Sequence, residues 1–136
     1  MTNLGVTHDI IEGESTSRPP YFDGSNYGYW KIRMKIYLQS IDYSLWLNVV
    51  KGPYVPMKNV NNTKVPKLED EFDEYDMKKC SLNARAIHYL YCALSNDEFN
   101  RVLMCSSASE IWKTLELIHE KTNQVKETQI SMLVHN

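Results

Sequence analysis

Glycine is scarce in this chain, with five residues scattered among 136. They form no Gly-rich loop, which excludes the phosphate-loop and dinucleotide-binding signatures, and the serine hydrolase signature is absent as well. The carboxylates gather in one acidic run, residues 69–76, which is typical of a solvated helix entry rather than of an opposed acid–base pair. We therefore expect no catalytic activity, no cofactor and no small-molecule substrate.

Cysteine is equally sparse, and Cys80, Cys92 and Cys105 include no C-x-x-C pair. An odd number of widely spaced cysteines suits reduced thiols in a cytosolic chain. His88 and Cys92 lie one helical turn apart and could share a metal, but no other Cys/His pair has ligand spacing. We interpret them as a core-edge histidine beside a small buried thiol, and we predict no metal site. His119 is expected on a polar helix face, without a special role.

Long apolar runs and an excess of positive charge are also lacking. No run approaches the roughly 20 residues of a membrane helix, and the N-terminus lacks a signal-peptide pattern. We therefore expect a cytoplasmic protein without a membrane partner. The 15 basic and 17 acidic residues give a net charge of −2. Binding to phosphate backbones depends on clustered Lys and Arg, so RNA contacts by this chain are expected to be weak.

What the chain has in abundance is apolar residues at helical spacing. A polar turn, residues 23–26, opens into a helix predicted over about 26–40, with Ser25 or Asn26 expected to cap it. One apolar stripe of this helix contains Tyr27, Trp30, Met34, Tyr37, Leu38 and Ile41. The opposite side carries Tyr29, Ile32 and Ile36. A helix that is apolar on two faces has two surfaces to pack. We therefore name these three residues as a candidate assembly interface, unless another helix of the chain covers them.

The remaining segments continue the helical pattern. Asp42 is expected to cap a short helix, residues 52–68 to form a long loop, and residues 77–94 the most buried helix. Ser95 with Glu98, and Ser107 with Glu110, are predicted capping boxes. Residues 1–18 are predicted to be a mobile tail, and residues 19–136 one helical domain that ends within a last helix begun near Val125. No run shows strand alternation with hairpin turn signals, so the predicted class is all-α, a compact bundle of about five to six helices.

Two segments carry a resemblance to a known family. Residues 22–30 resemble the F-x-G-x-N-Y-x-x-W opening of the Gag polyprotein of Copia-type LTR retrotransposons. Residues 107–115 resemble that family's S-A-x-E-x-W-x-x-L segment. The similarity extends over about residues 19–136. The residues at the motif positions are Phe22, Gly24, Asn26, Tyr27 and Trp30 in the first segment, and Ala108, Trp112 and Leu115 in the second.

The resemblance implies a capsid-like N-terminal lobe whose role is self-assembly, as a homo-oligomer, around element RNA. It also implies that the second capsid lobe and the RNA-binding zinc knuckle of a full-length Gag would follow the present sequence. An alternative is a host-adopted helical module that holds a protein partner without assembling. Oligomeric state separates the two: assembly predicts concentration-dependent multimers, whereas a module stays monomeric until its partner is added.

Overall fold

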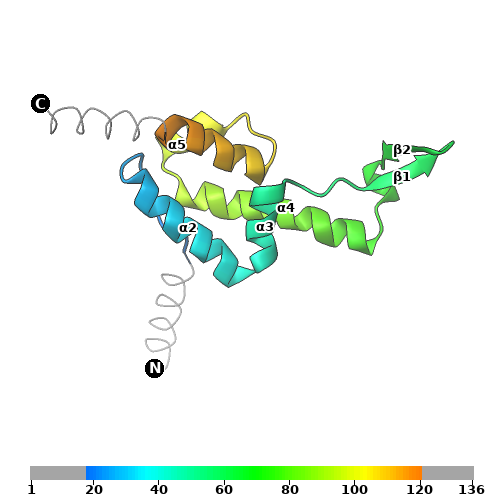
Figure 1. Ribbon diagram of the computed structural model, residues 1–136, viewed down its shortest axis with the longest axis horizontal. Helices are drawn as coiled ribbons and strands as arrows, with labels where there is room; N and C mark the ends of the chain where they lie inside the picture. Colours follow the sequence, from blue (N-terminus) through cyan, green and yellow to red (C-terminus); the bar gives the residue numbers. More distant parts are fainter. Residues whose placement is uncertain (1–17, 121–136) are drawn as a thin grey trace, which may run out of the picture.

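The computed structural model describes residues 18–120, which form helices and one small two-stranded sheet (Figure 1). The elements are α2 (Tyr27–Ile41), α3 (Tyr43–Lys51), β1 (Met57–Val60), β2 (Thr63–Pro66), a 3₁₀ turn η1 (Glu69–Glu71), α4 (Glu74–Ala93), α5 (Asn96–Val102) and a helix over residues 108–120. The predicted class, an all-α bundle of about five to six helices, is confirmed for this part, which contains five helices. The predicted tail, apart from Arg18, and the predicted last helix lie outside the described residues.

The core forms where the apolar stripes of these helices meet. The stripe of α2 buries Tyr27, Trp30, Met34 and Leu38, as its spacing predicted, whereas Tyr37 is only partly buried and Ile41, predicted on the same stripe, is exposed. Helix α2 contacts α3, and α3 contacts α4. The other buried apolar residues include Leu45 and Val49 of α3, Ala86 and Leu90 of α4, and Ala108, Ile111 and Leu115 of the helix over 108–120. Among the described helices, none combines the length and the apolar character needed to cross a membrane.

Most of the predicted helix caps are present. Asp42 accepts a hydrogen bond from the Ser44 amide at 2.9 Å, and α3 ends at Gly52, whose φ is +92°. Ser95 and Ser107 each accept a bond from the amide three residues on, as N-cap serines do. The prediction for the start of α2 is wrong, because Asn26 takes a left-handed conformation and its side chain makes no cap bond. Asp23 orders this turn instead, because its Oδ1 accepts from the Ser25 amide at 3.0 Å and from the Ser25 hydroxyl at 2.6 Å.

The prediction of a structureless loop over residues 52–68 is also wrong. Met57–Val60 and Thr63–Pro66 pair antiparallel, with Val60 opposite Thr63. Asn61 and Asn62 connect them with φ of 52° and 64°, the left-handed pair that a two-residue hairpin turn requires and that asparagine tolerates. The sequence does contain a signal for this hairpin, namely Asn61 and Asn62 between the β-branched residues Val60 and Thr63. The hairpin extends from one end of the bundle, beyond the start of α4 (Figure 1).

Helix α4 is less buried than its sequence suggested. Its buried residues are Asp76, Ala86, Leu90 and Ala93, so the apolar contacts belong to its C-terminal half. Met77 and Ala84 are exposed, although both lie in the segment predicted to be the most buried helix. The N-terminal half lies beside the hairpin and is held there by polar contacts.

Candidate functional site

The two motif segments meet in one aromatic cluster. The Phe22 ring stacks on Trp30 with centroids 4.8 Å apart, and Trp30 lies 5.6 Å from Trp112 of the second segment. Trp46 of α3 meets the Trp112 ring edge-on at 5.3 Å. Tyr27, Ala108 and Leu115 are buried around it. Most motif residues therefore build the core, whereas Asn26 is exposed and Trp112 also lines a surface groove.

The backbone of the first motif is fixed from two sides. The Phe22 amide donates to Ala93 O at 2.8 Å, and the Ser95 amide donates to Phe22 O at 3.0 Å, so the segment runs along the end of α4. Gly24 has a φ of +101°, and a Cβ added there would lie 3.0 Å from Glu98 Oε2. Glycine is thus required at this motif position for conformation and for space.

A largely buried contact between Glu98 and His119, behind this turn, is not indicated by the sequence pattern. Glu98 Oε1 lies 2.6 Å from His119 Nε2, and Arg101 approaches the other carboxylate oxygen at 3.5 Å. The His119 ring packs against Phe22 and Tyr27, with centroids 4.8 and 5.6 Å away. The His119 side chain, 12% exposed, therefore lies at the edge of the core, not on a polar face. The Glu98 side chain pairs with His119 and does not complete the predicted capping box.

The candidate assembly interface lies on the opposite side of α2. Tyr29, Ile32 and Ile36 are 66%, 62% and 57% exposed, so no other described segment covers them. Arg33 lies over the Tyr29 ring, with its guanidinium carbon 5.3 Å from the centroid. The stripe is therefore an apolar surface on a helix whose other face is fully occupied by the core.

A groove of about 420 Å³ adjoins this stripe between α2, α3 and the helix over residues 108–120. Its apolar walls are Ile32, Trp46, Val49, Val50 and Trp112. Lysines line its rim, and one of them, Lys31, donates to Glu116 at 2.8 Å and pairs with Glu120 at 3.2 Å. Burial lowers the pKa of Lys31, but the hydrogen bonds and charges of the two glutamates outweigh this and raise it. We call this feature the Trp46–Trp112 groove.

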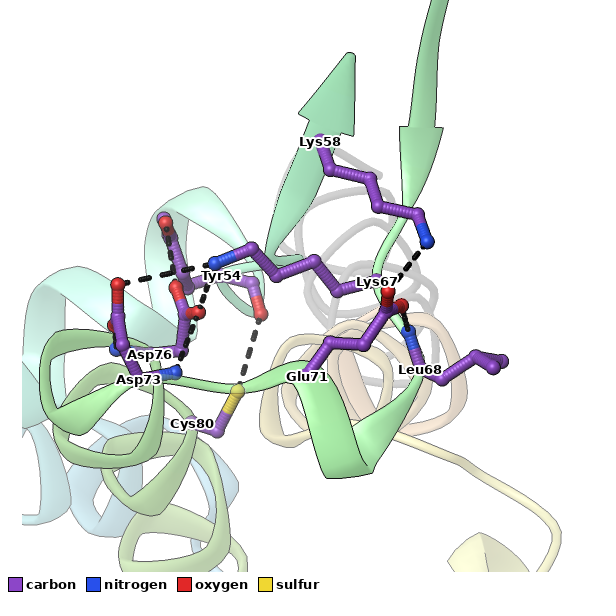
Figure 2. A network of polar contacts seen from close by, with 8 residues as sticks. All are labelled: Tyr54, Lys58, Lys67, Leu68, Glu71, Asp73, Asp76 and Cys80. Atoms are coloured by element: carbon purple, nitrogen blue, oxygen red, sulfur yellow. Dashed lines mark hydrogen bonds and ion pairs between the residues drawn. The ribbon is translucent and has the colours of Figure 1, made fainter. Parts of the chain in front are cut away.

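A polar network fixes the hairpin to α4 (Figure 2). Lys67 Nζ lies 2.6 Å from Asp76 Oδ2, and the Tyr54 hydroxyl donates to Asp76 Oδ1 at 3.2 Å. Asp76 is only 2% exposed and also accepts from the Asp73 amide at 3.1 Å. The hydrogen bond from Lys67 holds the pKa of Asp76 below its usual value, and the same contact raises the pKa of Lys67. These contacts give the hairpin a defined attachment.

The candidate metal pair has the predicted spacing but different surroundings. Cys92 Sγ lies 3.7 Å from His88 Nε2, yet both residues are exposed, so the interpretation of a buried thiol is wrong. Within residues 18–120, no group of three or more His, Cys, Asp or Glu side chains is arranged to hold a metal ion.

Comparison of the chain with models of known protein families, with curated proteins and with solved structures found no match. A function for this fold is therefore argued from the motif residues and from the surface.

Proposed function

We propose that this chain is a structural, self-assembling protein of the Gag type, related to the Gag polyproteins of Copia-type LTR retrotransposons. In its full-length form such a protein assembles into cytoplasmic particles around element RNA. The chain acts in this role by holding copies of itself, not by catalysis. One observation carries the proposal: Tyr29, Ile32 and Ile36 stay exposed on a helix whose opposite face is buried.

Exposed apolar surface of this kind commonly marks an interaction site, because its burial against a partner is favourable. The motif resemblance supports the same role. Three of the motif residues, Phe22, Trp30 and Trp112, form the aromatic cluster, so the motif is suited to specifying a helical lobe. A helical lobe with an exposed apolar stripe on one helix can contact another copy through that helix.

The test replaces the stripe. Ile32→Asp with Ile36→Asp should abolish concentration-dependent multimers in light scattering while circular dichroism remains helical, because both side chains are exposed. Met77→Asp with Leu117→Asp is the matched control, since it adds the same charge at exposed apolar positions elsewhere. Unfolding of the stripe variant would show that the stripe is core. Multimers that persist would place the interface elsewhere.

A wild-type protein that stays monomeric at every concentration would overturn the self-assembly proposal and favour a module for a different protein partner. RNA contributes little to the proposed contacts of this chain. Its net charge of −2 favours weak binding without sequence preference, which a gel shift at physiological salt would measure. Tight, sequence-selective binding to RNA in this gel shift would contradict the prediction of weak RNA binding.

A further inference from the structure

The Trp46–Trp112 groove has positive charges that the fold does not neutralise. Lys31 is committed to Glu116 and Glu120. Lys35 instead lies over the Trp46 ring, with Nζ 5.3 Å from the centroid, and Lys113 is exposed on the rim. Neither Lys35 nor Lys113 forms an ion pair with another described residue. The groove therefore suits an apolar side chain flanked by carboxylates.

The same chain carries such a group at the base of the hairpin. Leu68 is 68% exposed and is followed at once by Glu69 and Asp70, both exposed and without an ion pair among the described residues. Their backbone is held in place, because Glu71 accepts from the Leu68 amide at 2.8 Å and pairs with Lys58. We call residues 68–70 the acidic knob. It presents one leucine and two free carboxylates in a fixed turn.

The knob is formed by elements other than those that form the groove. It lies between β2 and α4, at the hairpin end of the bundle, whereas the start of α2 lies toward the opposite end (Figure 1). A surface that is complementary to a different surface of the same chain pairs copies head to tail, and such contacts build rings or filaments.

We propose that the acidic knob of one copy docks into the Trp46–Trp112 groove of the next, with Leu68 against the groove walls formed by Trp46 and Val50, and with Glu69 and Asp70 facing Lys35 and Lys113. This inference rests on the proposed self-assembly and names a pair of surfaces for it. Because carboxylates and ammonium groups meet at the rim of the contact, added salt should weaken it.

The experiment mixes two charge-reversed variants of the full chain. The groove variant is Lys35→Glu with Lys113→Glu, and the knob variant is Glu69→Lys with Asp70→Lys. Each alone should lose multimers in sedimentation at concentrations where the wild type assembles. A mixture should regain multimers, because the intact knob of one variant fits the intact groove of the other and the reversed knob carries the charge opposite to that of the reversed groove. If sedimentation shows the same multimer sizes for the mixture as for each variant alone, the proposal is overturned.

Matched controls separate this contact from general charge effects. Lys64→Glu with Lys78→Glu changes the net charge by the same amount at exposed lysines outside the groove, and should assemble normally. Leu68→Ala should lose assembly, whereas Leu103→Ala, another exposed leucine, should not. A loss of assembly in both controls would count against a specific knob.

The two proposals fail in different ways. Tyr29→Ser with Ile36→Asp alters the stripe and leaves every groove residue in place. If that variant stops assembly while the groove and knob variants assemble as the wild type does, the head-to-tail contact is wrong and self-assembly stands. If the wild type never assembles, both are wrong.

Discussion

The Trp30 and Trp112 rings lie 5.6 Å apart. They join the two motif segments, which lie near opposite ends of the described chain. Both are buried, and the Trp30 indole N–H donates to Pro20 O at 2.8 Å. Trp30→Ala and Trp112→Ala should each reduce the free energy of unfolding by about 3–5 kcal/mol, as the loss of a large aromatic from a packed core does. Urea titration measures this.

Trp46→Ala serves as the comparison, because Trp46 is only partly buried and lies at the edge of the same cluster. It should cost less than either of the other two changes. Losses below about 1 kcal/mol for Trp30→Ala or Trp112→Ala would mean that these rings are not part of the core.

Local patterns predicted the helices well. The three- and four-residue spacing of Trp30, Met34 and Leu38 identified the buried face of α2, and the serines at positions 95 and 107 identified two helix starts. Each of these signals acts within one or two helical turns, so the sequence alone carries it. The same spacing also placed Tyr29, Ile32 and Ile36 opposite the core, where the structure leaves them exposed.

Features that depend on residues far apart were not predictable in this way. The Glu98–His119 pair exists because α5 and the helix over residues 108–120 pack together behind the Phe22 turn. Nothing in the local spacing of either residue indicates its partner. The attachment of the hairpin to α4 was not predictable for a similar reason, since Lys67–Asp76 and Tyr54–Asp76 hold it there, whereas the hairpin itself had a local signal in Asn61 and Asn62. The groove likewise combines side chains of three helices.

Replacing Gly24 or Gly28 by alanine should change the stability of the fold in opposite directions. Gly24→Ala should destabilise the fold by at least about 1 kcal/mol, because φ is +101° and the new Cβ would lie 3.0 Å from Glu98 Oε2. Gly28→Ala should stabilise it by about 0.5 kcal/mol, because Gly28 is helical and its added Cβ meets no atom within 4 Å. Thermal unfolding of both variants would contradict this account if Gly24→Ala were neutral.

Zinc should not change the folded state. His88 and Cys92 supply two ligands, and a structural zinc site requires four. Circular dichroism and thermal unfolding should be the same with added zinc and with a chelator. Loss of helical signal on chelation would show that the chain holds a metal after all.

The Lys67–Asp76 contact should make the hairpin attachment sensitive to acid. The pKa of Asp76 is lowered in the folded protein, chiefly by the hydrogen bond from Lys67. A lowered folded pKa means that the stabilising contribution is complete above the ordinary aspartate value of about 4, and is lost as pH falls through the folded pKa. The raised pKa of Lys67 acts at the other extreme: its contribution is present below the ordinary lysine value and is lost as pH rises through the folded pKa.

Lys67→Met isolates this contact, because methionine keeps much of the apolar stem and removes the charge. The titration midpoint of the Asp76 carboxyl carbon, measured by NMR, should rise in this variant, and hydrogen exchange of the β1 and β2 amides should become faster. Lys64→Met is the control, since Lys64 is an exposed hairpin lysine whose removal leaves the Asp76 contacts unchanged. An Asp76 midpoint that stays low in Lys67→Met would assign the shift to the Asp73 amide and the Tyr54 hydroxyl, the other two groups that hydrogen-bond this carboxylate.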